Sequence, residues 1–185
     1  MLYRLVLLMI PVIVRQYQTT KAVRRGEAKK EIIGGRPSVV VWLFAYLTLL
    51  GFAIKQLATQ PLTWWFWVGY VVFWAAVILR WRASRSLKGF YAEAVVIQDD
   101  HRVVREGIYR HLRHPLHLGL WLEMLGLSMM SETWYSLPIL LLAFVTLLLR
   151  NRNEERLLEK YLGDAYREYR RTAWDVTDLI FRFRW

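Results

Sequence analysis

The chain has 185 residues, enough for a single domain of ordinary size. Hydrophobic residues make up 56% of it, and no charged residue occurs in three stretches, residues 37–54, 56–79 and 133–149. Each stretch is as long, or nearly as long, as the roughly 20 helical residues that cross a hydrocarbon core. This distribution excludes a water-soluble globular protein and a disordered chain.

The chain is basic, and its Lys and Arg residues are distributed around the apolar segments. There are 26 Lys and Arg against 15 Asp and Glu, which gives a net charge of +11. Because the basic residues lie mostly at the ends of apolar segments, the positive-inside rule explains the charge, and we expect membrane lipids and no nucleic acid as partners. The chain has no cysteine, which excludes disulfides, thiolate nucleophiles and metal sites with cysteine ligands.

Five membrane-spanning helices are predicted, at about residues 2–15, 38–55, 63–80, 116–131 and 134–150. The first is short and contains Pro11, and we interpret it as a signal-anchor-like helix rather than a cleaved signal. Between the last two spans there is room only for a tight turn, which predicts an antiparallel hairpin. The predicted fold class is an all-α integral membrane protein that forms a single domain over residues 1–185.

Charge counting in the connecting segments sets the predicted orientation. The segments after the first, third and fifth spans are rich in Lys and Arg, whereas the segment after the second contains only Lys55 and the turn after the fourth contains neither. The N-terminus is therefore predicted outside and the C-terminus in the cytoplasm, in a prokaryotic inner membrane. Residues 80–114 and 150–185 then form a cytoplasmic polar region, in which the β-branched run 94–98 is expected to be extended.

All four histidines lie between positions 101 and 117. A metal site is one interpretation, but Pro115 interrupts the histidine spacing and no cysteine or second carboxylate is close in sequence, so no metal is predicted. The other interpretation places some of these rings at the level of the lipid headgroups. His114 precedes Pro115, which suits the first turn of a helix, so His114 is expected at a helix N-terminus, where free N–H groups attract anions.

Three charged residues in or after the last two spans are candidates for chemistry. Glu123 lies within a predicted span, where an ionisable group is by default functional or paired with a neighbouring helix. Arg150 and Glu154 are four residues apart on the helix that leaves the fifth span, so they share a face. They supply a cation for an anionic group and a carboxylate for a cationic one, unless they form an ordinary surface ion pair.

Two segments resemble the motifs of a known family. Residues 101–119 resemble the H-x-L-V-x-x-G-x-Y-x-x-x-R-H-P-x-Y-x-G signature of isoprenylcysteine carboxyl methyltransferases, and residues 150–169 resemble their R-x-R-x-E-E…F-G-x-x-Y-x-x-Y block. The spacing is kept in both motifs, and the resemblance covers roughly residues 79–169. The superfamily also includes phospholipid N-methyltransferases, small-thiol methyltransferases and sterol reductases that use a nicotinamide cofactor.

The resemblance implies an integral membrane enzyme that uses S-adenosylmethionine to O-methylate the carboxylate of a lipid-like or prenylated substrate. Glu154 would hold the amino group of the cofactor, and Arg150 would act in catalysis by holding the substrate carboxylate. A carboxylate is already ionised at neutral pH, whereas an amine must lose a proton, for which Glu123 or His117 would be the catalytic base. The other cofactor-binding residues that the resemblance implies are His101, Val103, Val104, Tyr109, His114, Pro115, Leu116 and His117.

The chain departs from the family motifs in two places. The family tyrosine two positions after the proline is His117 here, and residues 171–175 replace the usual proline-containing end. Three alternatives stay open: an N- or S-methyltransferase of the same superfamily, an NADPH-dependent sterol-type reductase, and a non-catalytic membrane scaffold. The reductases typically carry a glutamate where this chain has Leu120. The methyltransferase interpretation requires His114 and Glu154 to face each other at the cytoplasmic end of the last two spans.

Overall fold

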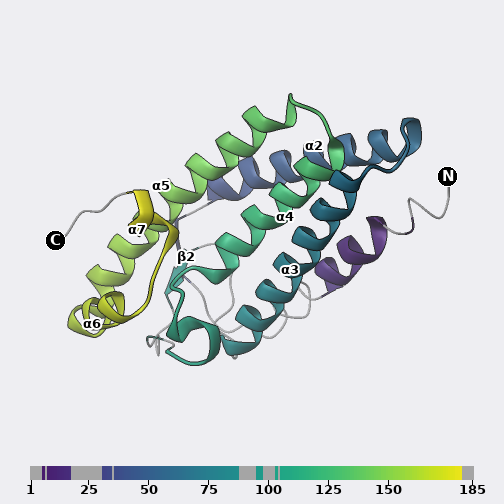
Figure 1. Ribbon diagram of the computed structural model, residues 1–185. Helices are drawn as coiled ribbons and strands as arrows, with labels where there is room; N and C mark the ends of the chain where they lie inside the picture. Colours follow the sequence, from purple (N-terminus) through teal and green to yellow (C-terminus); the bar gives the residue numbers. More distant parts are fainter. Residues whose placement is uncertain are drawn as a thin grey trace.

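The computed structural model describes residues 6, 8–17, 31–34, 36–87, 95–97, 103 and 105–180. Helices dominate these residues, and α4 lies between α3 and α5 in the view of Figure 1. The helices are an N-terminal helix (Leu8–Tyr17), α2 (Arg36–Thr59), α3 (Trp64–Ser86), α4 (Pro115–Ser131), α5 (Ser136–Leu162), α6 (Asp164–Thr172) and α7 (Val176–Ile180), with a 3₁₀ turn, η1, at Gly107–Arg110.

A small antiparallel sheet accompanies the helices. β1 (Glu31–Gly34) pairs with β2 (Val95–Ile97), with Ile32 opposite Val96. β2 confirms the extended segment expected at residues 94–98. The partner strand β1 was not predicted, because its four residues show no pattern of their own and the strand that it pairs with is far away in the sequence. The described fold is therefore helical, as predicted, with one added β element that ties the segment before α2 to the segment after α3.

Two of the described helices are long and apolar enough to cross a membrane, Ser38–Thr59 within α2 and Trp64–Ser86. They coincide with the second and third predicted spans. α4 has only 17 residues, and α5 continues into the charged sequence that starts at Arg150, so neither offers the same length of uninterrupted apolar helix. The first predicted span overlaps the shorter apolar helix Leu8–Tyr17. Helices thus occur at all five positions, while five membrane crossings stay a prediction.

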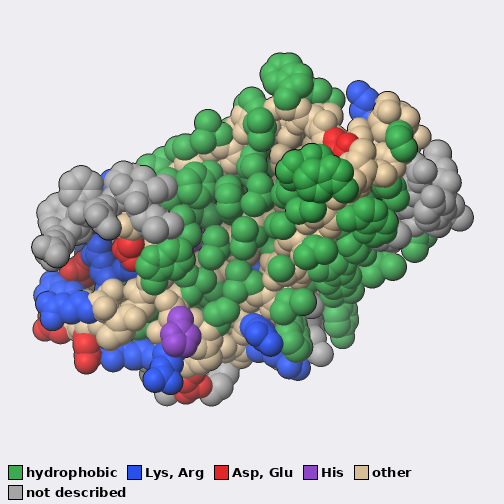
Figure 2. All heavy atoms as spheres, viewed as in Figure 1, with side chains coloured by type: hydrophobic (Ala, Val, Ile, Leu, Met, Phe, Trp, Pro, Cys, Tyr) green, Lys and Arg blue, Asp and Glu red, His purple; other side chains and the backbone are tan. Residues whose placement is uncertain are grey.

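The outer faces of the helices are apolar. Large hydrophobic side chains that are exposed include Leu43 and Phe44 on α2 and Leu141 and Leu142 on α5. Figure 2 shows hydrophobic side chains over the middle of the visible face, with charged side chains gathered at the end where α6 and α7 lie. An apolar surface of this kind indicates contact with lipid, and the charged end indicates the part of the protein outside it.

α3 and α4 cross with their backbones in near contact at a pair of glycines. A Cβ atom at Gly69 would lie 2.7 Å from the carbonyl oxygen of Gly126, and a Cβ atom at Gly126 would lie 2.7 Å from the carbonyl oxygen of Gly69. Small residues at a crossing let helices approach closely, which gives the packing contacts that hold helices together in lipid. This crossing fixes α4 against α3, and with it the residues at the start of α4.

We expect Gly126→Leu to lower the melting temperature of the detergent-solubilised protein, because added methylene groups in a tight contact cost about 1–3 kcal/mol. Gly51→Leu is the matched control, since a Cβ atom at Gly51 has nothing within 4 Å. Thermal unfolding followed by tryptophan fluorescence measures both. Equal melting temperatures for the two variants would contradict the close crossing of α3 and α4.

Candidate functional site

The first turn of α4 is where several predicted site residues gather. His114 is the residue before the helix, with φ −121° and ψ 56°, and Pro115 is the first helical residue. Proline suits this position because its missing N–H would have no helical partner. The expected helix start is therefore confirmed. His114 and His117 both contact α5 from this turn.

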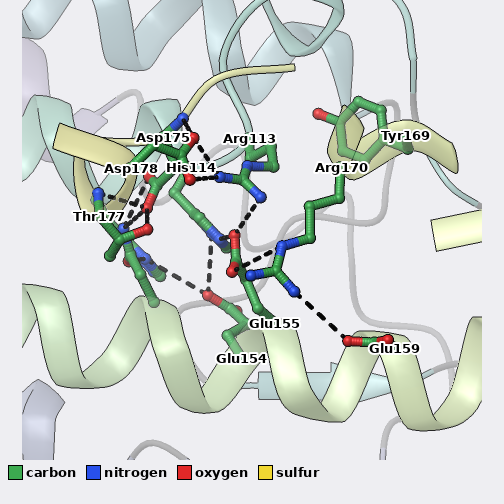
Figure 3. A network of polar contacts seen from close by, with 12 residues as sticks. Arg113, His114, Glu154, Glu155, Glu159, Tyr169, Arg170, Asp175, Thr177 and Asp178 are labelled. Carbon is green, nitrogen blue, oxygen red and sulfur yellow. Dashed lines mark hydrogen bonds and ion pairs between the residues drawn. The ribbon is translucent and has the colours of Figure 1, made fainter. Parts of the chain in front are cut away.

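His114, His117 and Glu154 form a cluster of side chains between α4 and α5. The Nδ1 atoms of His114 and His117 lie 3.5 Å and 3.4 Å from the same oxygen of Glu154, Oε2. The two imidazole rings are parallel, with centroids 5.6 Å apart. Figure 3 shows His114 and Glu154 pointing toward each other. Positions 114 and 154 thus face each other, as the methyltransferase interpretation requires.

A second set of charges surrounds this cluster. Arg113 Nη1 lies 2.9 Å from Glu155 Oε1, and Arg113 Nη2 donates to Asp178 Oδ1 at 2.6 Å. Glu155 Oε2 also lies 3.7 Å from Arg170 Nε. Arg113 and Glu155 are buried, so these contacts are the compensation that buried charges need. They join the start of α4 to α5, α6 and α7 (Figure 3).

Residues 173–178, here called the C-terminal strap, pass alongside the residues that precede α4. The backbone N–H of Arg113 donates to Trp174 O at 2.8 Å, and the N–H of Trp174 donates to His111 O at 2.8 Å. These bonds form a short parallel bridge between Leu112 and Trp174. The segment that replaces the proline-containing end of the family motif, residues 171–175, therefore packs against the residues just before α4.

Asp175 is a buried acid of the strap, only 1% exposed. Its carboxylate accepts from Asn151 Nδ2 at 3.1 Å, from the backbone N–H of Thr177 at 3.0 Å and from the Thr177 hydroxyl. Burial alone would raise the pKa of Asp175, but His114 and the Thr177 hydrogen bonds lower that pKa below its usual value. Asn151 Oδ1 in turn lies 2.7 Å from His117 Nδ1. A chain of hydrogen bonds thus runs from the strap through α5 to His117.

Arg150 lies beside the cluster, on the side of α5 that faces α2. It is 4% exposed, its Nη1 donates to Ser38 Oγ at 3.0 Å, and its guanidinium carbon lies 4.9 Å from the centre of the Trp42 ring. The same indole ring is 5.2 Å from the ring of His117. Trp42 therefore contacts both Arg150 and His117, which places a permanent cation next to the histidine–glutamate cluster.

His114 and Glu154 each stabilise the charged form of the other. Burial alone would lower the pKa of His114, but its contacts with Glu154 and Glu155 raise that pKa from 6.5 to about 10. Burial alone would raise the pKa of Glu154, but His117, His114 and Arg150 outweigh it and lower that pKa from 4.5 to about 2. At neutral pH the site therefore contains an imidazolium at His114 and a carboxylate at Glu154.

Two other predicted cofactor-binding residues pack beside this charged region. Tyr109, in η1, is buried, and its carbonyl oxygen accepts from the hydroxyl of Tyr169 at 2.7 Å. Val103 packs against the small cluster formed by Tyr166, Tyr169 and Ala173. Among the remaining predicted residues, Pro115 is buried and Leu116 half-buried in the first turn of α4, while His101 and Val104 lie outside the described residues.

Glu123 lies in a different buried network. Its side chain is 0% exposed, with Oε2 3.2 Å from Arg15 Nε and Oε1 3.4 Å from Arg80 Nε. Arg15 also lies over the ring of Tyr46, 4.6 Å from its centre. Of the two interpretations of a glutamate within a span, these contacts favour pairing with neighbouring helices. The predicted catalytic role of Glu123 stays a prediction, and in the described part of the chain no ion pair or hydrogen bond joins it to His114 or Glu154.

The described residues include two groups of three side chains whose ligand atoms lie within 4.8 Å of one another. The groups are His114, His117 and Glu154, and His114, Glu155 and Asp175. Opposite charges and hydrogen bonds account for both, since His114 is paired with the two glutamates and His117 Nδ1 contacts Asn151. We interpret both as ionic clusters, and the absence of a metal stays a prediction.

Sequence reasoning missed three residues of the site. Glu155 is the second glutamate of the R-x-R-x-E-E segment, but no function was predicted for it. Its position next to Glu154 was the only sequence feature that could have indicated it. Asn151 occupies a variable position of the second motif, Asp175 lies outside both motifs, and the two are 24 residues apart in the chain. Only the return of the C-terminal strap brings them together, so no local pattern could have found them.

Together the fold and the site define a helical membrane protein with a buried histidine–carboxylate cluster between two consecutive helices. A model of the isoprenylcysteine carboxyl methyltransferase (ICMT) family matches residues 67–160, half of the chain, and the chain belongs to this family.

Similar curated proteins agree with this assignment. The chain is 34% identical over 82 residues to the protein-S-isoprenylcysteine O-methyltransferase of Schizosaccharomyces pombe, covering 44% of this chain and 35% of that protein. It is 27% identical over 115 residues to the protein of the same name from Dictyostelium discoideum, covering 58% and 47%. It is 21% identical over 124 residues to the uncharacterized protein YpbQ of Bacillus subtilis, covering 66% and 73%. The chain thus spans between a third and a half of the length of the first two relatives.

The cluster fits the charged end of S-adenosylmethionine, which carries an ammonium group and a carboxylate. Glu154 Oε2 and His114 Nε2 are buried and make no hydrogen bond in the described part of the chain. Their nearest partners are ion-pair contacts of 3.4 to 3.6 Å, which leaves both atoms capacity for a closer contact with a ligand. Glu154 suits the ammonium group, and the imidazolium of His114 suits the carboxylate.

We expect the stability of the solubilised protein to fall as the pH rises from 7 to 10. Because the pKa of His114 is raised from 6.5 to about 10 in the folded state, its contribution is complete below pH 6.5 and is lost as the pH passes about 10. His114→Asn should flatten this fall, and His111→Asn, at an exposed position, should keep it. Melting temperatures measured across this range test the expectation, and an unchanged slope in His114→Asn would contradict it.

Proposed function

We propose that the chain is an S-adenosylmethionine-dependent membrane methyltransferase that acts on a lipid-like acceptor. The observation that carries this proposal is the cluster in which Glu154 faces His114 and His117, beside the buried cation of Arg150. Membership of the ICMT family supports the reaction class. The names of two relatives, isoprenylcysteine O-methyltransferases, support a lipid-like acceptor.

The charges of the site assign a role to each residue. Glu154 holds the ammonium group of the cofactor, and His114 holds its carboxylate. When bound, the cofactor supplies a methyl group whose bond to a sulfonium sulfur breaks with the electron pair left on sulfur. The protein must hold the acceptor in line with that bond and exclude water from it. Burial of His114, Trp42 and Arg150 provides such a rigid and dry surrounding.

The apolar surface next to Arg150 suits an acceptor with a hydrocarbon tail. Val40 and Leu43 on α2 and Leu149 on α5 are exposed. Arg150 itself lies on α5, and α2 carries Ser38 and Trp42, which contact it. A tail can therefore lie against these side chains in the membrane while the reacting group reaches Arg150. The proposal includes the predicted orientation, in which the site opens to the cytoplasm.

The acceptor group distinguishes two candidate reactions. A carboxylate, as in the substrate named for the two relatives, needs an orienting cation, and Arg150 is proposed for that role. A thiol or amine carries a proton that the site must remove, and His117, in place of the family tyrosine, favours this second candidate.

We expect S-adenosylmethionine to raise the melting temperature of the native protein, as any ligand of the folded state does. Glu154→Gln should weaken cofactor binding about tenfold or more, because a hydrogen bond to a charged group is worth about 1.5–3 kcal/mol. Glu168→Gln is the matched control, since its side chain is 70% exposed on α6. Thermal shifts over a range of cofactor concentrations give the dissociation constants.

The same assay tests the remaining alternatives when NADPH is included as a second ligand. Protection by NADPH without protection by S-adenosylmethionine would contradict the proposal and favour a reductase. No response to either ligand, in the native protein and in Glu154→Gln alike, would favour a non-catalytic scaffold.

A further inference from the structure

His117 stands where the family motif has a tyrosine, and its neighbours determine which ring nitrogen carries a proton. The starting point is Asp175, whose buried carboxylate can only accept hydrogen bonds. Asn151 must therefore turn its amide NH₂ toward Asp175, at 3.1 Å. Its carbonyl oxygen Oδ1 is then the atom that faces His117 Nδ1, at 2.7 Å.

An amide oxygen can only accept, so His117 Nδ1 must carry the hydrogen. Glu154 Oε2, 3.4 Å from the same nitrogen, is negatively charged and favours the same tautomer. In the neutral ring this leaves Nε2 with a lone pair. Among the described residues no hydrogen bond reaches Nε2, and the His117 side chain retains 15% exposure.

The charged groups around His117 disfavour a second proton on its ring. His114, the residue before α4, carries a positive charge and is stacked on His117, with ring centroids 5.6 Å apart. Arg150, from α5, lies on the Trp42 ring that also contacts His117. Glu154 is the nearby anion, and its Oε2 contacts His114 as well as His117. Trp42, from α2, adds no charge, so two cations face one shared carboxylate and keep the ring neutral.

We propose that Asp175 and Asn151 are positioning residues that hold His117 as the Nδ1–H tautomer, so that Nε2 accepts a proton from the methyl acceptor. The acceptor is then a lipid-like molecule whose nucleophilic atom carries a proton, namely a thiol, an amine or an acidic hydroxyl. A carboxylate has no such proton, and it would face the lone pair of Nε2. This inference rests on the proposed methyl transfer and names its substrate class.

The transfer balances with these residues. The acceptor atom uses its lone pair to form the bond to the methyl carbon, and the carbon–sulfur bond breaks with its electron pair left on sulfur. The proton of the acceptor moves to His117 Nε2. The resulting imidazolium keeps Nδ1–H donating to Asn151 Oδ1, with the negative charge of Glu154 Oε2 3.4 Å away, and Nε2–H later releases its proton to water.

The tautomer can be measured without any reaction. Histidine labelled with ¹⁵N reports the protonation of each ring nitrogen by NMR, and His117→Gln identifies the resonances among the four histidines. We expect the Nδ1–H form in the native protein at pH 7. Asp175→Asn should change it to the Nε2–H form, because an asparagine at 175 can donate to Asn151 Oδ1 and turn the Asn151 NH₂ toward His117.

Asp164→Asn is the control for the loss of a negative charge, since the Asp164 side chain is 95% exposed on α6. In this variant His117 should keep the native tautomer. A native His117 in the Nε2–H form, or doubly protonated at pH 7, would overturn the proposal. This measurement on the native protein needs no variant to fold beyond the one used for assignment.

Acceptor class is tested with methyl-labelled S-adenosylmethionine and four acceptors in detergent: N-acetyl-S-farnesylcysteine, dodecanethiol, dodecylamine and 4-nonylphenol. We expect label in a thioether, amine or ether that resists base. Asp175→Asn should lower kcat about 100-fold, the usual contribution of a general base. It should change the KM of the cofactor less than about threefold, since Glu154 and His114 remain.

Label found only in a base-labile ester, or an effect of Asp175→Asn confined to KM, would overturn the inference. In either case methyl transfer itself would still be observed. Failure of the proposed function gives a different result, with no label in any acceptor and no thermal shift with the cofactor.

Discussion

The contact between His114 and Glu154 is the interaction on which the rest of the site depends. A charged side chain that leaves water requires a partner of opposite charge, and removing one member of a buried pair leaves the other uncompensated. His114 at the start of α4 and Glu154 on α5 meet this need for each other. The neighbouring pair repeats the arrangement, with Arg113 just before His114 in the segment that leads into α4 and Glu155 just after Glu154 on α5. Two successive ion pairs thus hold the start of α4 against α5.

Such pairs form only if the helices are placed accurately, and glycines set part of that placement. Gly69 and Gly126 let α3 and α4 cross with their backbones in contact. Gly119, on α4, leaves the space that the side chain of Arg80 occupies on its way to Glu123. Gly119 is also the last glycine of the signature at residues 101–119. The motif glycine therefore contributes through packing, because its missing side chain leaves room for Arg80 of α3.

The sequence predicted the parts of the site that lie on regular helices. A proline at a helix start placed His114, and the spacing of four residues placed Arg150 and Glu154 on one helix, because helix geometry is local. The C-terminal strap could not be predicted in this way. Asp175 reaches Asn151 only after the chain has passed through α6 and turned back, and no periodic pattern encodes such a return. The strand β1 escaped prediction for a related reason, since its partner is far away in the sequence.

Glu123 and Glu154 show how two glutamates near the same helix differ in chemical capacity. Each oxygen of Glu123 lies within 3.4 Å of an arginine nitrogen, and its side chain is 0% exposed. Those two cations already exceed its charge, so a ligand cation would have to displace one of them. Glu154 is contacted by two imidazoles through a single oxygen, and one of these rings is held neutral by its other neighbours. Its carboxylate therefore keeps the capacity to bind a further cation. That difference, which depends on the partners and not on burial alone, is why Glu154 suits a ligand and Glu123 suits a helix contact.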